Sequence, residues 1–136
     1  MQTGGFKGRS REVEPDELRR AISRRYGVPE THIVAEYGMT ELSSQLYETT
    51  LRGDTHRRLW APGWVRARVV DPESLAEVEE GVAGILRLDD AANLDSVCAI
   101  QTSDVAIRHG QTFLLLGRAP GSVPRGCSLA VEEALG

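Results

Sequence analysis

The sequence has little cysteine and almost no lysine. Its 136 residues include two cysteines, Cys98 and Cys127, and a single lysine, Lys7. The cysteines have neither the CxxC spacing of a zinc site nor the density of a secreted disulfide scaffold, so we expect two free thiols. The three histidines are scattered, and no pair has the i, i+4 spacing of a zinc-binding helix. Neither a zinc site nor a disulfide framework is expected.

Long apolar runs and an excess of one charge are also missing. No run approaches the roughly 18 apolar residues that a membrane span requires, and residues 1–5 lack the charged and apolar regions of a secretory signal. With 16 basic and 20 acidic residues, the net charge of −4 gives no electrostatic reason to expect nucleic acid or an anionic membrane as a partner. We therefore predict a cytoplasmic protein without a membrane span and without a nucleic-acid partner.

The composition favours one domain with a core, because 40% of the residues are hydrophobic in a chain of 14.9 kDa. A helix is predicted from about Pro15 to Tyr26, where Leu18, Ile22 and Tyr26 recur every four residues. Proline suits the first turn of a helix, and Gly27 is expected to end it. Acidic residues lie at the start and arginines follow, which is the order that the helix dipole favours.

The rest of the chain is typical of short strands. His32–Glu36 is predicted as a strand that ends at a loop, and Val65–Val69 alternates as a half-buried strand does. A turn is expected at Asp71–Ser74 and a hairpin turn at His109–Gly110. Four brief apolar runs predict successive antiparallel pairs: Ile85–Leu88, Val97–Ile100, Val105–Ile107 and Phe113–Leu116. The predicted fold class is mixed α/β (α+β), a small β-subdomain with an N-terminal helix.

Three further local predictions concern side-chain packing and the C-terminus. Cys98 lies in a strand-like apolar run and is assigned to the core. Trp60–Trp64 is interpreted as a packed, turn-forming aromatic pair. The last apolar stretch, Leu129–Leu135, is expected to form one or two helical turns after a polar loop.

One pentapeptide, Tyr37–Glu41, combines groups that suit a nucleotide. The ring of Tyr37 could stack on a base, and Gly38 lets the backbone approach a ligand. The hydroxyl of Thr40 could bind a phosphate oxygen, and the Glu41 carboxylate could hold Mg²⁺. Taken alone, however, a tyrosine-glycine sequence is most often an ordinary turn.

Later residues could complete such a site. The two oxygens of an ionised Asp104 could accept both ribose hydroxyls, and Arg118 could donate to ribose or phosphate. The thiol of Cys127 is a potential nucleophile, which nearby Arg125 would favour as thiolate. Each has an ordinary alternative: Asp104 as a turn residue, Arg118 as a solvated charge, Cys127 as a small buried apolar residue.

These residues, in this order, resemble the adenylate-forming superfamily of acyl-CoA synthetases, firefly-type luciferases and peptide-synthetase adenylation domains. Tyr37, Gly38, Thr40 and Glu41 match its Tyr-Gly-x-Thr-Glu motif, which contacts AMP and magnesium. Gln101–Val105 is similar to its Thr-Gly-Asp segment, and Gly117–Arg118 to a Gly-Arg pair that follows a hairpin. The resemblance implies a partial adenylate-forming fold that uses ATP and Mg²⁺.

Within that superfamily the chain resembles the LuxE-type acyl-protein synthetases of bacterial bioluminescence. The likeness is carried by Thr3–Gly8, Glu36–Gln45, Leu116–Gly121 and Arg125–Leu129. It implies a ligase that activates a long-chain fatty acid as acyl-AMP, passes the acyl group to a cysteine at the position of Cys127, and serves an acyl-reductase subunit. It also implies that Gly4 and Gly5 approach the adenine edge.

A Ser/Thr/Gly-rich loop that grips the ATP phosphates upstream of the motif in this superfamily is missing here. We therefore expect the C-terminal third of such an enzyme, inactive alone, in three parts: residues 1–50 with the helix and nucleotide motif, 51–118 rich in strands, and 119–136 with the acceptor cysteine. Two alternatives stay open, a piece of an acyl-CoA ligase-type adenylating enzyme and a non-catalytic nucleotide-binding or subunit module.

Overall fold

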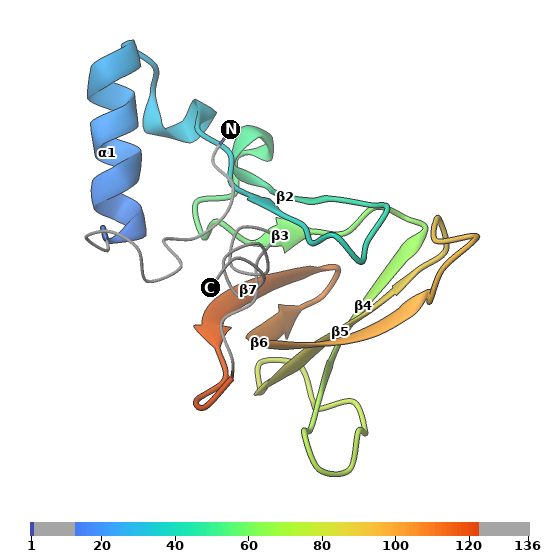
Figure 1. Ribbon diagram of the computed structural model, residues 1–136. Helices are drawn as coiled ribbons and strands as arrows, with labels where there is room; N and C mark the ends of the chain where they lie inside the picture. The colour runs from blue at the N-terminus through green and yellow to red at the C-terminus, as the bar shows by residue number, and fades with distance from the viewer. Residues whose placement is uncertain (2–12, 123–136) are drawn as a thin grey trace, which may run out of the picture.

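The computed structural model describes Met1 and residues 13–122. In that part of the chain one helix, α1 (Pro15–Tyr26), stands beside a single β-sheet (Figure 1). The strands are β1 (Glu36–Tyr37), β2 (Leu46–Glu48), β3 (Leu59–Trp60), β4 (Val65–Val70), β5 (Ala83–Asp90), β6 (Ala99–His109) and β7 (Thr112–Arg118), with 3₁₀ turns at Glu30–His32 and Thr50–Arg52. The predicted mixed α/β class is confirmed.

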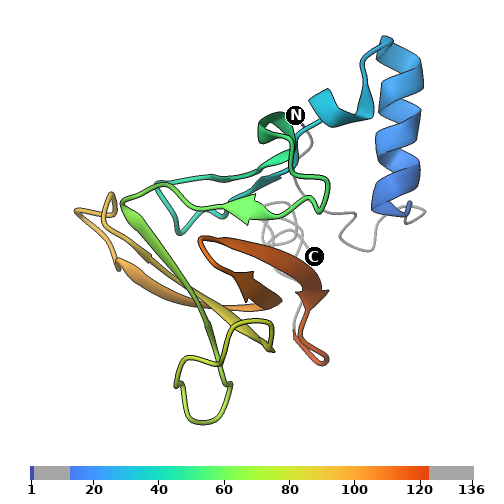
Figure 2. The ribbon, with the colours of Figure 1, turned by 180° about the vertical axis from the view of Figure 1, so that it is seen from behind.

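The sheet is antiparallel throughout, and its strand order is β1-β2-β3-β7-β6-β5-β4. The first three strands form one meander. The chain then crosses to the far edge at β4 and returns strand by strand until β7 pairs with β3. Figures 1 and 2 show from opposite sides that the resulting sheet is strongly bent.

The concave side of the bent sheet holds the hydrophobic core. Leu46 of β2 and Val65 of β4 belong to the same buried cluster, although four strands lie between β2 and β4 in the sheet. Leu86 and Leu88 of β5 are completely buried in it, two residues apart and therefore on the same face of their strand. The curl thus allows a single sheet to bury its own inner face.

Helix α1 has the predicted bounds, but a different residue anchors it. Asp16 and Glu17 lie in its first turn, Arg24 and Arg25 in its last, and Gly27 ends it with φ +64°. Arg19 is buried and forms a two-pronged ion pair with Glu48 of β2, with Nη2 2.6 Å from Oε2 and 2.9 Å from Oε1. Tyr26, one of the three residues of the predicted apolar repeat, is 74% exposed.

The strand predicted at His32–Glu36 is largely wrong. Residues Glu30–His32 form a 3₁₀ turn, and only Glu36–Tyr37 pairs in the sheet. The reason lies in the partners of the backbone carbonyls. The Arg19 guanidinium donates hydrogen bonds to the carbonyl of Ile33 and, at 3.4 Å, to that of Glu30. These carbonyls therefore bond to a side chain of α1 and not to a neighbouring strand.

Two of the short strands predicted from the sequence belong to one strand in the structure. Val97–Ile100 and Val105–Ile107 both contribute to the continuous strand β6, and in its polar middle Gln101 pairs with β5 and Asp104 with β7, while the β5–β6 register shifts between Gln101 and Val105. Val65–Val69, Ile85–Leu88 and Phe113–Leu116 lie within β4, β5 and β7, and His109 pairs with Thr112 across the predicted hairpin turn.

The predictions for Cys98 and the tryptophan pair need correction. Cys98 is exposed, since it lies in the turn before β6 and contributes only its carbonyl, which accepts from the Asp90 amide at 2.7 Å. The Trp60–Trp64 segment does turn, through a Val65 N to Pro62 O hydrogen bond of 2.8 Å. Trp64 is nevertheless 60% exposed, so the two rings are not a packed pair.

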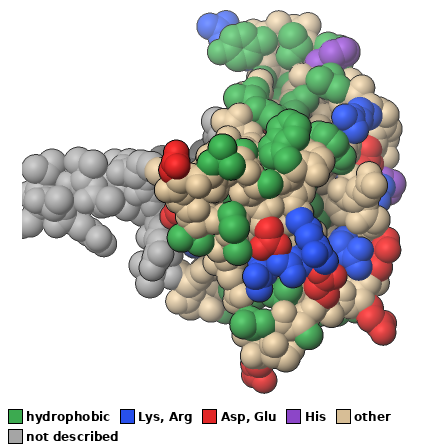
Figure 3. Space-filling model, turned by 90° about the vertical axis from the view of Figure 1, so that its right-hand side faces the viewer, with side chains coloured by type: hydrophobic (Ala, Val, Ile, Leu, Met, Phe, Trp, Pro, Cys, Tyr) green, Lys and Arg blue, Asp and Glu red, His purple; other side chains and the backbone are tan. Residues whose placement is uncertain are grey.

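The surface near the β5–β6 turn mixes apolar and charged side chains. Trp64, Leu94 and Val97 are exposed there. An ion-pair network joins Arg66 and Arg68 of β4, Arg87 and Asp89 of β5, and Glu77 of the connection between the two strands. Figure 3 shows this side, with hydrophobic side chains above a compact group of basic and acidic ones. In the part of the chain that the structure describes, no helix is long and apolar enough to cross a membrane.

Candidate nucleotide site

Three of the predicted site residues meet on the sheet. Asp104 of β6 lies directly opposite Arg118 of β7, with its Oδ1 3.7 Å from Arg118 Nε. The Tyr37 hydroxyl, from β1, donates to Asp104 Oδ2 at 2.6 Å. Three strands separate β1 from β6, so the curl of the sheet brings these groups together. The Asp104 side chain remains 20% exposed and can be reached from solvent.

The backbone around Asp104 is irregular in a way that fixes this carboxylate. The β6–β7 register shifts between Val105 and Ala106, and Gly117, opposite Val105, has φ +119°, which favours glycine. The Thr102 hydroxyl accepts from the Asp104 amide at 3.0 Å and donates to the Leu86 carbonyl at 2.9 Å. The extra residue of this bulge lies on β7, and a second register shift, between β5 and β6, falls between Gln101 and Val105 of β6 and so includes Asp104.

Tyr37 acts as a hydrogen-bond donor in this arrangement. Burial of its ring raises the pKa of Tyr37 far above its usual value, and the adjacent Asp104 carboxylate raises it further. The hydroxyl therefore keeps its proton throughout the neutral range. It orients Asp104, whose side-chain oxygens still have acceptor positions for other donors.

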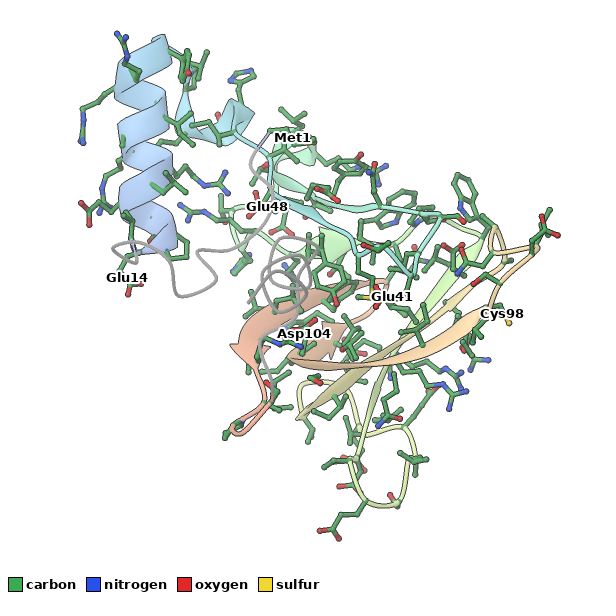
Figure 4. All side chains as sticks on the ribbon, in the orientation of Figure 1. Met1, Glu14, Glu41, Glu48, Cys98 and Asp104 are labelled. Atoms are coloured by element: carbon green, nitrogen blue, oxygen red, sulfur yellow. The ribbon has the colours of Figure 1, made fainter. Side chains whose placement is uncertain are left out.

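Thr40 and Glu41 form the tip of a turn that closes with a Leu42 N to Met39 O hydrogen bond of 3.1 Å. Met39 and Leu42 pack against the core, whereas Thr40 and Glu41 are exposed. The turn thus buries its two apolar ends and presents a hydroxyl and a carboxylate. In Figure 4 Glu41 and Asp104 both lie near the centre of the view, and Cys98 lies at the right-hand end of the molecule.

Gly38 connects Tyr37 to this turn. A Cβ at position 38 would lie 2.5 Å from Glu36 Oε1, so any side chain there would displace the Glu36 carboxylate. Such a shift costs little, because this oxygen is the far end of a flexible side chain, so the contact alone does not demand glycine.

Two residues that hold the loop were missed by the sequence analysis. Asp90, at the end of β5, and Asn93, in the following turn, are buried, and both hydrogen-bond to residues 41–44 of the loop between β1 and β2. A local signal existed, because Asp and Asn directly after a strand often bond to nearby backbone. Their partners lie about fifty positions earlier, which no local pattern reveals.

The remaining predicted site residues are Gly4, Gly5 and Cys127, and they lie outside the described residues. Within Met1 and residues 13–122, no three His, Cys, Asp or Glu side chains form a group that could hold a metal ion. Magnesium commonly needs only one or two carboxylates when substrate phosphates complete its shell. The exposed Glu41 carboxylate fits that mode of binding.

The whole chain matches one protein family. Residues 1–136 match the family model described as "Acyl-protein synthetase, LuxE". The chain belongs to the LuxE acyl-protein synthetase family. The resemblance stated from the sequence is thereby confirmed.

Two relatives of this LuxE-family chain are named long-chain-fatty-acid–luciferin-component ligase. The protein from Vibrio harveyi is 24% identical over 140 residues, which cover 96% of this chain and 36% of the relative. That from Aliivibrio fischeri is 28% identical over 108 residues, which cover 73% of this chain and 27% of the relative. The chain therefore spans about a third of the length of the relatives it matches.

Solved structures of adenylate-forming enzymes share the fold of this LuxE-family chain. Apo MatB from Rhodopseudomonas palustris superposes with a TM-score of 0.59 at 20% identity, covering 89% of this chain and 26% of MatB. ATP-bound MatB superposes with a TM-score of 0.52 at 19% identity, covering 74% of this chain and 23% of MatB. The described sheet and helix are thus part of the adenylate-forming fold.

Proposed function

We propose that this chain supplies the ribose- and phosphate-facing part of the nucleotide site of an ATP-dependent acyl-protein synthetase. The observation that carries the proposal is the meeting of Tyr37, Asp104 and Arg118 on the concave side of the sheet. The names of the relatives, long-chain-fatty-acid–luciferin-component ligase, support a long-chain fatty acid as the substrate. The ATP-bound MatB structure supports ATP as the co-substrate.

Each group has a role that its chemistry allows. Asp104 accepts the ribose hydroxyls, since its carboxylate has about four acceptor positions and Tyr37 uses one of them. Arg118 donates to the ribose or to phosphate. The ring of Tyr37 stacks on adenine, and its hydroxyl contact with Asp104 sets base and ribose side by side, as they are in a nucleoside.

The exposed turn supplies the phosphate side of the site. The Thr40 hydroxyl binds a phosphate oxygen, and Glu41 holds Mg²⁺, which would neutralise charge on the phosphates of ATP. The reaction that we propose has two steps. A carboxylate oxygen of the fatty acid attacks the α-phosphorus of ATP and pyrophosphate leaves. The Cys127 sulfur then attacks the acyl carbon, AMP leaves, and the thiol proton passes to solvent.

Binding of nucleotide to this 136-residue chain tests the proposal directly. Calorimetry with AMP and ATP is expected to give micromolar dissociation constants for the wild-type chain. Asp104→Asn is expected to weaken AMP binding about tenfold or more, which corresponds to roughly 1.4 kcal/mol. Asp95→Asn, the same change at an exposed residue in the β5–β6 turn, should leave binding unaltered. A wild-type chain that does not bind AMP at millimolar concentration would overturn the proposal.

The acceptor role of Cys127 and the identity of the acceptor need the longer enzyme. Cys127→Ser should retain ATP–pyrophosphate exchange and lose stable labelling by radioactive fatty acid. Labelling that survives the substitution would refute the role of the cysteine. Formation of free acyl-CoA when coenzyme A is added would favour an acyl-CoA ligase in place of an acyl-protein synthetase.

A further inference from the structure

The turn after β5 is bonded to the loop that carries Thr40 and Glu41. Asp90 is completely buried, and both of its carboxylate oxygens are used by the loop. Oδ2 accepts from the Ser44 amide at 2.9 Å, and Oδ1 accepts from the Ser44 hydroxyl at 2.9 Å. Oδ1 also accepts from the Ala92 amide at 2.9 Å, which fixes the carboxylate from its own side.

Asn93 makes the second connection. Its Nδ2 donates to the carbonyl of Glu41 at 2.8 Å and to that of Val97 at 3.1 Å, and its Oδ1 accepts from the Ser43 amide at 2.8 Å. The amide orientation is fixed by these partners, because a carbonyl can only accept and a backbone amide can only donate. A single buried side chain thus holds the loop on both sides of Leu42.

A third contact to the same region comes from the turn that precedes β4. The Trp64 indole N–H donates to the Ser44 hydroxyl at 2.9 Å, and that hydroxyl donates to Asp90. Asp90 also lies opposite Val65 in the β4–β5 ladder, so it belongs to the core face of the sheet. These contacts attach the Ser43–Ser44 backbone to the end of β5 and to the turns beside it.

We propose that Asp90 and Asn93, here called the anchor pair, are positioning residues that hold the Thr40–Glu41 turn at a fixed place relative to Asp104. The proposal rests on the proposed function, in which the turn addresses the phosphates and Asp104 the ribose. Asp104 lies on β6, which pairs with β5. The anchor pair therefore connects the phosphate side of the site to the end of β5, the strand that pairs with the one carrying Asp104.

The proposal predicts different effects on ligands with and without phosphates. Loosening the turn should reduce affinity for ligands with phosphates and leave affinity for adenosine unchanged, because adenosine would contact only Tyr37, Asp104 and Arg118. Asn93→Asp suits this test, because the change conserves shape and the acceptor for Ser43. It replaces the donor to Glu41 and Val97 with an oxygen that repels both carbonyls.

The experiment has two measurements on the 136-residue chain, with Asp95→Asn as the matched control. Amide hydrogen exchange should show that Asn93→Asp speeds exchange at Ser43 and Ser44 about tenfold or more, with unchanged protection at Leu86 and Leu88. Calorimetry should show ATP binding weakened about tenfold and adenosine binding unaltered. Ser44→Ala is a milder second variant should Asn93→Asp not fold, because it removes the hydroxyl and keeps the hydrogen bond from the backbone amide of residue 44 to Asp90. It should speed amide exchange and weaken ATP binding by less than Asn93→Asp does.

The outcomes separate the two proposals. Unchanged exchange at Ser43 and Ser44, or equal weakening of ATP and adenosine, would overturn the positioning role while leaving the nucleotide site in place. A wild-type chain that binds neither ATP nor adenosine would overturn the proposed function, and the positioning role with it. Selective loss of ATP affinity together with faster exchange supports both.

Discussion

Tyr37 offers a ring and a hydroxyl to the candidate site, and the two parts can be tested separately. The hydroxyl donates to Asp104, and the half-buried ring is the surface on which we propose that adenine stacks. Stacking of a base on an aromatic ring contributes about 1–3 kcal/mol. We therefore expect Tyr37→Ala to weaken AMP binding by roughly 5- to 150-fold in calorimetry. Tyr37→Phe keeps the ring and loses only the hydroxyl contact with Asp104, so it should weaken AMP binding less than Tyr37→Ala.

The comparison of the two variants decides which part of the side chain matters. Equal losses for Tyr37→Phe and Tyr37→Ala would mean that the hydroxyl, through its hold on Asp104, carries the effect and that the ring does not stack. Tyr47, an exposed tyrosine on β2, gives the control: Tyr47→Ala should not alter AMP affinity.

The residues of this candidate site could be named from the sequence, but the contacts between them could not. Tyr37, Asp104 and Arg118 could be named from a family resemblance, and the structure brings all three together. Residue chemistry alone could not join Tyr37 to Asp104, because 67 positions separate them and only the curl of the sheet makes the contact. Asp90 and Asn93 carry no motif, and their importance appears only when their partners are known.

The attachment of α1 to the sheet depends on one buried ion pair. The side chains of Arg19 and Glu48 are 4% and 8% exposed, and Glu48 Oε2 also accepts from the Ala35 amide at 2.8 Å. Removing one partner of a buried pair leaves the other charge without compensation and costs about 3–5 kcal/mol. We expect Arg19→Met to lower the free energy of unfolding by about that amount, measured from urea unfolding curves.

Two further variants check that the effect comes from the unpaired charge. Arg19→Met combined with Glu48→Gln removes both charges and keeps an acceptor for the Ala35 amide, so it should recover much of the loss. Arg24→Met, on the exposed side of the same helix, should change stability by no more than about 0.5 kcal/mol. A double variant as unstable as Arg19→Met would contradict the explanation.

Local signals explain which elements could be predicted. The bounds of α1 follow from Pro15 and Gly27, which act within one turn of the chain, and the prediction is confirmed. The sequence predicts two strands in place of β6, because Gln101–Asp104 is polar and resembles a turn. In the structure this polar stretch stays in the sheet and carries Asp104 into the candidate site. A local rule failed where a candidate functional residue lies.

At the scale of the whole molecule, hydrogen-bonded aspartates make stability depend on pH. Thr49 and the His56 amide donate to Asp54, and these bonds, followed by Arg58, hold the pKa of Asp54 well below its usual value. Burial alone would raise the pKa of Asp90, but donors from Ala92 and Ser44 outweigh it and lower the pKa. Donors from Ser74 lower the pKa of Asp71.

These depressed pKa values fix the sign of the pH dependence. A carboxyl whose pKa is lower in the folded state stabilises the fold above its unfolded pKa of about 3.9 and loses that contribution as pH falls through the folded pKa. We expect the free energy of unfolding from urea titrations to fall steadily below about pH 4. Asp54→Asn and Thr49→Val should both flatten that fall, the first by removing the carboxyl and the second by removing its main donor. Slopes equal to the wild type in both variants would show that Asp54 does not contribute to the acid sensitivity of the fold.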